Sequence, residues 1–309
     1  MEPTPATDPP DPSAEPAGYV VVVGPGDRIH FHDWGGPTLR TRPGILLLHG
    51  LSQTAWIWAP VARRLRSTAA TIAMDLRGHG LSDAPTGDDD YAPAVLAEDA
   101  VAVAEGSGLL AAATDRVVLA GHGFGAVVAA WAAAALGDRC AGLVLVDGGW
   151  ESLEAATGVD VDEFLRGLDE PPEVMRSLAA YMADRKGFDP STWDADQRRA
   201  AEATVVETHA GRVVPSTRPH ALEASVRTMF RYDPIATLGP VVAPVVAVRA
   251  GADDDGSRSA SLAAVSAART AAGRTPIATM EFEGTGHNLM RYRPSEVTAA
   301  ILSLAPAIS

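Results

Sequence analysis

The stretch Val117-Val118-Leu119-Ala120-Gly121-His122-Gly123-Phe124-Gly125-Ala126-Val127-Val128 decides the fold that we predict for this chain. It opens with four apolar residues, continues with glycines at alternate positions, and leads into an alanine-rich segment that runs to Leu136. The apolar run indicates a buried strand, the glycines permit a tight turn, and the alanine-rich segment is typical of a helix. We therefore expect a strand, a sharp turn and a helix in direct succession.

The glycine spacing of this turn matches G-x-S-x-G, a pattern in which the backbone turns sharply and presents one side chain above a sheet. The presented residue here is Gly123, which has no oxygen, sulfur or carboxylate to attack a substrate. A nucleophile at such a turn sits in a strained conformation that costs on the order of 1–3 kcal/mol, and glycine removes much of that strain. The sequence therefore predicts a nucleophile elbow that lacks its nucleophile.

The amino-acid composition argues against several classes of binding partner. The chain has 309 residues, a hydrophobic content of 47% and a net charge of −14, which argues against nucleic acid or an anionic membrane as a partner. The lone cysteine, Cys140, lies in an apolar run and is expected to be a buried small hydrophobe. No apolar run reaches the ~18 residues of a membrane span, so we expect a cytoplasmic protein with a small-molecule partner. No metal cluster or G-x-G-x-x-G loop is evident, so no cofactor or metal is expected.

Strands and helices alternate on both sides of the turn. Besides the strand that leads into the turn, the expected strands cover residues 19–23, 28–34, 44–49, 71–76, 141–146, 245–249 and 276–282. The helices expected between them cover residues 55–66, 92–105, 124–136, 257–272 and 294–304. Such alternation implies parallel pairing and a sheet that is covered by helices on both faces.

Two segments fall outside this alternation. Residues 151–234 contain helix-like segments and no convincing strand, so we expect a helical cap inserted into a core of residues 19–150 and 235–309. The helix-like segments lie near residues 160–168, 172–184, 194–209 and 221–230. Residues 1–18 are rich in proline and acid, without the basic start and apolar centre of a signal peptide, and are expected to form a disordered tail.

Four elements in this order resemble the α/β-hydrolase superfamily over nearly the whole chain after the tail. They are the strand ending in His49-Gly50, the loop Asp75-Leu76-Arg77-Gly78-His79-Gly80, the glycine-flanked turn, and the late Gly284-Thr285-Gly286-His287. The resemblance implies the α/β-hydrolase fold, with a mostly parallel sheet of about eight strands and helices on both faces. It also implies an active site at the carboxyl ends of the strands, beneath the cap.

The resemblance assigns a histidine and an acid to that site. His287 follows the last expected strand, where the family keeps its catalytic histidine. Its acid partner is expected after the strand 245–249, where counting from Pro244 favours Asp253 and counting from Gly251 favours Asp254; we prefer Asp253. Asp147, which ends the preceding strand, is expected to be structural.

The backbone N–H groups of Leu51 and Phe124 are the donors that the resemblance implies for an oxyanion hole. Both are main-chain groups and survive the loss of a serine. Ser52 lies close to them and offers another hydroxyl, although a loop-capping role fits it better. Trp150 is expected to pack or to form a pocket wall, and His122 to pack beneath the turn.

These residues support three hypotheses of function. In the first, an α/β-hydrolase-like enzyme acts on a small, fairly apolar ester-like or other carbonyl substrate, with His287 as the base and no covalent intermediate. Loss of a triad member in serine hydrolases still leaves ~10³–10⁴-fold catalysis over water, so slow turnover is credible. In the second, the chain is a catalytically degenerate ligand-binding or scaffold protein. In the third, the same pocket serves a cofactor-free lyase, decarboxylase or cyclase.

Overall fold

The predicted strand, turn and helix are present in the computed structural model, which describes residues 14–38, 41–87, 89–111, 115–251 and 256–307. Strand β5 (Val117–His122) ends at Gly123, and helix α3 (Phe124–Leu136) begins at the next residue. Every residue of β5 is buried, as expected for a strand with neighbours on both edges and helices on both faces.

The central sheet has eight strands in the order β1-β2-β4-β3-β5-β6-β9-β10. Their bounds are β1 (Ala17–Val23), β2 (Asp27–Asp33), β3 (Gly44–Leu48), β4 (Thr71–Met74), β6 (Cys140–Val146), β9 (Val245–Ala250) and β10 (Ala278–Phe282). Strand β2 pairs antiparallel with both β1 and β4, and the other pairs are parallel. The predicted mostly parallel sheet of about eight strands is confirmed.

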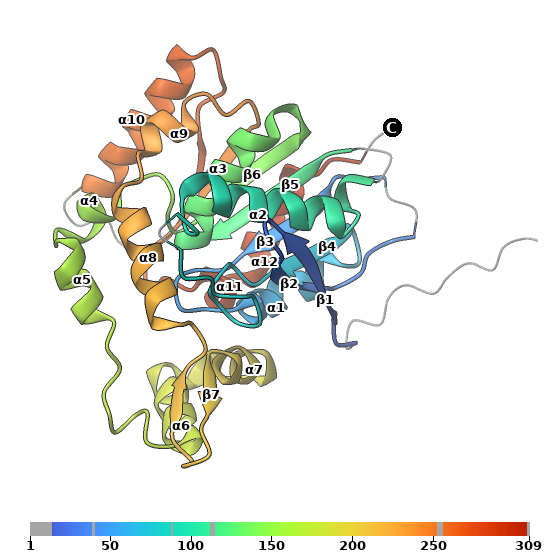
Figure 1. Ribbon diagram of the computed structural model, residues 1–309. Coiled ribbons are helices and arrows are strands. Elements are labelled where there is room, and N and C mark those ends of the chain that lie inside the picture. Colours follow the sequence, from blue (N-terminus) through green and yellow to red (C-terminus); the bar gives the residue numbers. More distant parts are fainter. Residues whose placement is uncertain (1–13, 39–40, 88, 112–114, 252–255, 308–309) are drawn as a thin grey trace, which may run out of the picture.

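The sheet separates two hydrophobic cores because successive side chains of a strand point to opposite faces. In β3, Leu46 and Leu48 belong to one core, and Ile45 and Leu47 to the other. The first core is covered by α2 (Pro93–Gly106), α3 and α10 (Ser257–Ala271). The second is covered by α1 (Ala59–Leu65), α11 (Leu289–Tyr292) and α12 (Pro294–Ser303) (Figure 1). Helices on both faces were predicted and are present.

The segment between β6 and β9 corrects two details of the prediction. It contains α4 (Leu153–Thr157), α5 (Val161–Gly167), α6 (Leu178–Phe188), η4 (Pro190–Thr192), α7 (Ala195–Ala203), α8 (Pro219–Phe230) and α9 (Pro234–Leu238). It also contains an antiparallel pair, β7 (Val205–Glu207) and β8 (Val213–Pro215), where no strand was expected. The helix expected from residue 172 begins at Leu178 instead, because the Ser177 hydroxyl caps it by accepting the N–H of Ala180.

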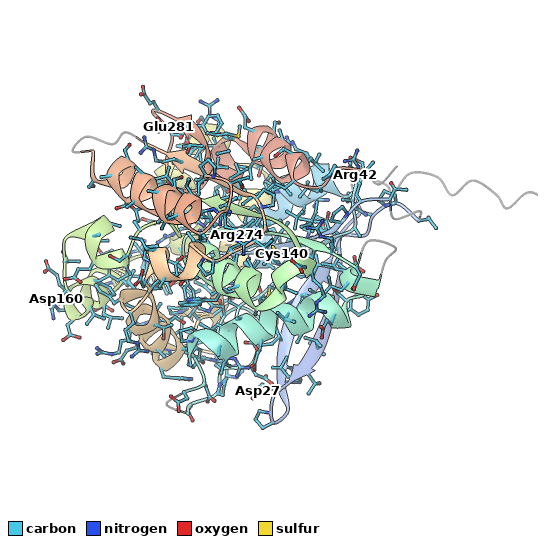
Figure 2. All side chains as sticks on the ribbon, turned by 90° about the horizontal axis from the view of Figure 1, so that it is seen from above. Asp27, Arg42, Cys140, Asp160, Arg274 and Glu281 are labelled. Atoms are coloured by element: carbon cyan, nitrogen blue, oxygen red, sulfur yellow. The ribbon has the colours of Figure 1, made fainter. Side chains whose placement is uncertain are left out.

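Two further expectations concern the amino-terminal tail and Cys140. Strand β1 begins at Ala17, inside the expected tail, and the Ala14 carbonyl accepts hydrogen bonds from Arg63 and Arg66; residues 1–13 lie outside the described residues. Cys140, labelled in Figure 2, is buried as expected. Among the described residues, no helix combines the length and apolar character needed to cross a membrane.

Candidate active site

The turn after β5 retains the backbone geometry of an elbow. Gly123 has φ 51° and ψ −114°, a left-handed conformation that favours glycine, and its N–H donates to the carbonyl of Val146 at 3.1 Å. A Cβ built on Gly123 would lie 3.4 Å from His287 Nε2. A Cβ at Gly125, in contrast, would lie 2.3 Å from the carbonyl oxygen of Leu48. Gly125 therefore permits close packing, whereas Gly123 has room for a side chain that would face His287.

His287 is held from behind by a carboxylate at the end of β6. Its Nδ1 lies 2.6 Å from Asp147 Oδ2, which assigns the proton of this bond to Nδ1 and leaves the lone pair on Nε2. Nε2 is the ring nitrogen that faces Gly123. Asp147 itself has a φ of 47°, an uncommon value for a residue other than glycine. The structure therefore brings together the imidazole of His287, the carboxylate of Asp147 and the turn at Gly123.

Asp147 is a strongly stabilised carboxylate. Burial opposes its ionisation, but the hydrogen bond from His287 and the charges of His287 and Arg258 outweigh burial and lower the pKa of Asp147 to about 2. Its Oδ1 accepts hydrogen bonds from Arg258 Nη2 at 2.8 Å and from the N–H of Ala250 at 2.9 Å. Both carboxylate oxygens are therefore engaged, and the side chain has little freedom to turn away from His287.

Arg258 links this carboxylate to a second acid. Its Nε donates to Glu151 Oε1 at 3.1 Å, and its guanidinium lies 5.2 Å from the centre of the Trp150 ring. The side chains of Asp147 and Glu151 are only 6% and 8% exposed. The charged groups around His287 thus form a chain of ion pairs in which each charge has a partner.

Sequence reasoning treated Asp147 as structural and did not anticipate its contact with His287. The described side chain that contacts His287 Nδ1 is Asp147, whereas the predicted partners Asp253 and Asp254 lie outside the described residues. A signal was available, because Asp147 directly follows a strand of seven buried residues whose carboxyl end adjoins the elbow. Carboxyl ends of parallel strands meet at one edge of a sheet, so this position was as favourable as the predicted one.

Two main-chain donors flank the elbow. Leu51 and Phe124 both line the cavity in front of His287, together with Ser52. Within the described part of the chain, no hydrogen bond is formed by the N–H of Leu51 or of Phe124. Phe124 is the first residue of α3, and a first-turn N–H has no partner inside its own helix.

His122 positions the loop that carries His287. Its ring is 1% exposed, with Nε2 3.1 Å from the carbonyl oxygen of His287 and Nδ1 3.1 Å from Gln53 Oε1. Burial and then the nearby His287 keep the pKa of His122 well below its usual value. A neutral, buried His122 therefore supports the site from beneath, in agreement with the packing role expected from the sequence.

The cavity over the elbow has a volume of about 470 Å³. Its walls are largely apolar and include Leu51, Phe124, Val127, Leu153, Phe164 and Met229. Trp150, expected as packing or a pocket wall, is fully buried beneath Arg258 and does not line this cavity. No group of three or more metal-binding side chains occurs in the described part of the chain. The arrangement can hold a small molecule with its reactive carbon between His287 and the two donors.

A scan of family models matches residues 45–301 to the alpha/beta hydrolase family. The chain belongs to this family. 2-(Acetamidomethylene)succinate hydrolase of Mesorhizobium japonicum is 26% identical to this family member over 287 residues, which cover 89% of this chain and 94% of the relative. Mouse epoxide hydrolase 4 is 33% identical over 119 residues, 38% of this chain, and the match spans only 31% of the mouse protein.

Solved structures of hydrolases share this architecture. The crystal structure of E-2-(acetamidomethylene)succinate hydrolase superposes with a TM-score of 0.74 at 24% sequence identity, covering 93% of this chain and 98% of the other. At this identity the likeness establishes the fold. Both sequence relatives named above are hydrolases.

Proposed function

We propose that this chain hydrolyses a small carbonyl substrate, such as an ester, by activating a water molecule directly, without a covalent intermediate. The observation that carries the proposal is the alignment of Asp147, His287 and Gly123. The acid fixes the imidazole, and Nε2 faces an elbow residue that has no side chain of its own. A water molecule at that position takes the place of the serine hydroxyl.

In the proposed reaction, one proton moves from water to His287 and then to the leaving alcohol. His287 Nε2 removes a proton from water while the oxygen forms a bond to the substrate carbonyl carbon. The carbonyl oxygen becomes an oxyanion, which accepts hydrogen bonds from the N–H groups of Leu51 and Phe124. The carbon–oxygen bond to the leaving group then breaks, and the protonated His287 returns the proton to the departing alcohol. Asp147 stabilises the imidazolium in between.

The surroundings favour this chemistry over simple ligand binding. Asp147 is kept ionised by three hydrogen bonds although it is buried, and its backbone is strained. Strain and buried charge of this kind cost free energy and are typical of functional sites. The largely apolar cavity and the hydrolase relatives support a small substrate with an apolar portion.

His287→Ala tests the proposal. We expect turnover of activated esters such as 4-nitrophenyl butyrate to fall by about 10²–10⁴-fold, because the general base is removed. The measurement is steady-state hydrolysis, with melting temperature as the control for folding. A folded His287→Ala variant that keeps wild-type turnover would overturn the mechanism.

A further inference from the structure

A second cavity adjoins the one over the elbow. It has a volume of about 380 Å³ and shares Leu51, Ser52, Gln53 and Leu168 with the first cavity. The loop that carries the Leu51 donor therefore forms part of the wall of both cavities. A substrate whose carbonyl lies at His287 can extend past this loop into the second cavity.

The charged side chains of the first cavity, apart from His287, are two carboxylates and one guanidinium. Asp147 pairs with His287 and Arg258, and Arg258 pairs in turn with Glu151. Because Arg258 already pairs with both Asp147 and Glu151, a substrate carboxylate would be repelled by these acids or would have to displace one of them from Arg258, which is unfavourable. The first cavity is therefore suited to the neutral part of a substrate.

The second cavity contains two arginines in different states. Arg185 contacts both carboxylate oxygens of Glu170 at 2.7 and 2.6 Å, pairs with Asp184 at 3.3 Å, and packs over the Tyr181 ring. Its charge is thereby neutralised within the wall. Arg185 therefore has a structural role in the cavity wall.

Arg291 differs, because its described hydrogen bonds go to neutral oxygens. Nε donates to the Thr192 hydroxyl at 2.5 Å and Nη2 to the carbonyl oxygen of Asp189 at 2.6 Å. Among the described residues it forms no ion pair with a carboxylate. The pKa of Asp189 is lowered mainly by its hydrogen bond from Ser191 and less by the charge of Arg291. The two bonds hold the Arg291 guanidinium in place while leaving other N–H groups of the fork for a ligand.

Asn288 adds a second donor to the wall of the same cavity. It precedes α11, lies three residues before Arg291 and lines the same cavity, so both residues fall on one face of a helical turn. The Arg291 N–H donates to the Asn288 carbonyl at 2.8 Å, which fixes that turn. Asn288 Oδ1 accepts from Gln53 Nε2, and the described residues give its amide nitrogen no partner.

We propose that Arg291 and Asn288 bind a free carboxylate of the substrate, so that the substrate class is an ester or related carbonyl compound with a carboxylate in its acyl or alcohol part. The planar guanidinium matches a carboxylate in geometry, and the amide supplies one more donor. Because His287 directly precedes Asn288 in the chain, the short segment 287–291 holds both the base and the anchor. This inference rests on the proposed hydrolysis only for the position of the carbonyl.

The test compares matched pairs of esters in wild type and Arg291→Met. One member of each pair carries a carboxylate, as in 4-nitrophenyl hydrogen glutarate and adipate and in butyryl esters of hydroxy acids. The other member is its neutral methyl-capped counterpart. We expect wild type to prefer the carboxylate by about 10-fold or more in kcat/KM, expressed mainly in KM, because a charge-assisted contact is lost with the neutral ester. The preference should disappear in Arg291→Met and persist partly in Arg291→Lys.

Arg293→Met is the matched control, since Arg293 lies two residues later and outside the cavity wall. It should keep the wild-type preference. Should Arg291→Met fail to fold, Arg291→Gln, which retains a donor for Thr192, takes its place. Equal preference in wild type and the folded Arg291 variant would overturn the inference while leaving the hydrolysis proposal intact.

A binding measurement separates the two proposals. Melting temperatures of the His287→Ala protein are recorded with glutarate, adipate and suberate, with and without Arg291→Met. Stabilisation that depends on Arg291 supports the anchor even if no ester is hydrolysed. Identical shifts with and without Arg291 would contradict it.

Discussion

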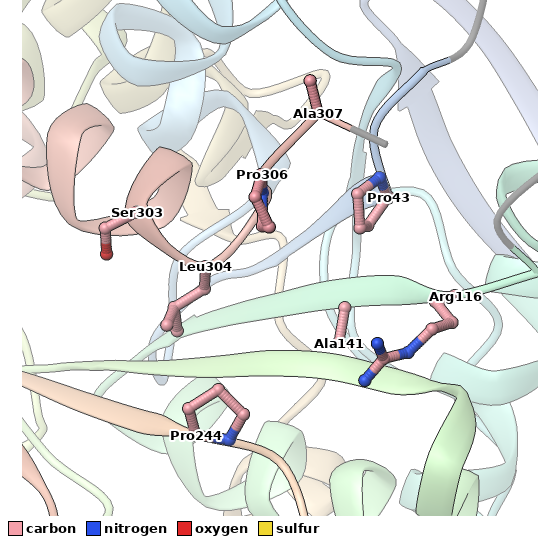
Figure 3. Close-up of a pocket in the computed structure, with 8 residues that line it drawn as sticks. All are labelled: Pro43, Arg116, Ala141, Pro244, Ser303, Leu304, Pro306 and Ala307. Atoms are coloured by element: carbon pink, nitrogen blue, oxygen red, sulfur yellow. The ribbon is translucent and has the colours of Figure 1, made fainter. Parts of the chain in front are cut away.

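The two ends of the same sheet each contain a hollow, yet they differ in chemistry. At the amino ends of β3, β5, β6 and β9, a hollow of about 290 Å³ is surrounded by Pro43, Arg116, Ala141, Pro244, Ser303, Leu304, Pro306 and Ala307 (Figure 3). Its charged member, Arg116, donates to the carbonyl oxygens of Asp138 and Cys140 at 3.1 and 3.2 Å. At the carboxyl ends, the cavity of about 470 Å³ contains the His287 and Asp147 pair.

Strand direction explains this difference better than cavity size. Every parallel strand emerges at its carboxyl end into a loop, so residues that follow different strands converge there. Leu51 follows β3, Gly123 follows β5 and Asp147 follows β6. At the amino end, the loops before β5, β6 and β9 arrive from helices and the loop before β3 arrives from β2, and the charged group there, Arg116, satisfies main-chain carbonyls. A hollow becomes a candidate active site when strand ends deliver groups that face one another.

Gly123→Ser is expected to have the largest effect on activity. It also tests most directly whether the carboxyl end of the sheet holds the reactive groups. If the elbow, base and donors are aligned, the new hydroxyl lies against His287 Nε2 and becomes a nucleophile. We expect labelling by a fluorophosphonate, absent in wild type, and a rise in ester turnover of up to about 10⁶-fold, the loss seen when such a serine is removed elsewhere. Intact-mass spectrometry measures the labelling.

Gly123→Ala is the control for this change. Both variants place a Cβ at φ 51° and should lose on the order of 1–3 kcal/mol of unfolding free energy. Only the serine variant should react with the probe. A folded Gly123→Ser protein that stays unlabelled would show that the groups at the carboxyl end of the sheet are not aligned to activate a serine.

Asp147→Asn is expected to have the next largest effect. The amide cannot hold the imidazole in the required tautomer, and the same change in a Ser-His-Asp triad lowers kcat by about 10⁴-fold. Turnover of 4-nitrophenyl butyrate by the variant should therefore fall close to that of His287→Ala. Wild-type turnover in a folded Asp147→Asn variant would show that Asp147 does not take part in the reaction.

At low pH, Asp147 should lose its contribution to the free energy of unfolding. Its folded pKa of about 2 lies below the ordinary 3.8, so the ionised form stabilises the folded state. The contribution, about 2 kcal/mol from this difference, is complete above the unfolded pKa and is lost as the pH falls through the folded pKa. Urea unfolding of wild type and Asp147→Asn should therefore show a stability difference that shrinks below about pH 4. A difference that grows on acidification would contradict this sign.

Much of the fold was predictable because its signals are local. The apolar runs that became β3, β5 and β6 and the glycines at 121, 123 and 125 fixed the strand, turn and helix pattern. The pair β7 and β8 was missed because three residues per strand are too few to show a period. The start of α6 was missed because a proline and acid-rich stretch ahead of Ser177 has helical spacing without helical structure.

The acid partner was harder to predict for a geometric reason. Strands β6 and β9 are neighbours in the sheet, and the N–H of Ala250 at the end of β9 donates to Asp147 at the end of β6. An aspartate after either strand could therefore come within reach of His287. Spacing along the chain cannot choose between them; among the described residues, the carboxylate that contacts Nδ1 is that of Asp147.

Arg116→Ala gives the smallest expected effect and tests the other side of the comparison. The guanidinium bonds two carbonyl oxygens in a partly exposed position, so its loss should lower the free energy of unfolding by about 0.5–1 kcal/mol. Ester turnover should be unchanged, since Arg116 lies at the amino end of β5 and Gly123 follows the carboxyl end of that strand. Urea unfolding and steady-state hydrolysis measure the two quantities. If Arg116→Ala lowered turnover as strongly as Asp147→Asn, the chemistry could not be confined to the carboxyl ends, and strand direction would fail as the explanation of where the site lies.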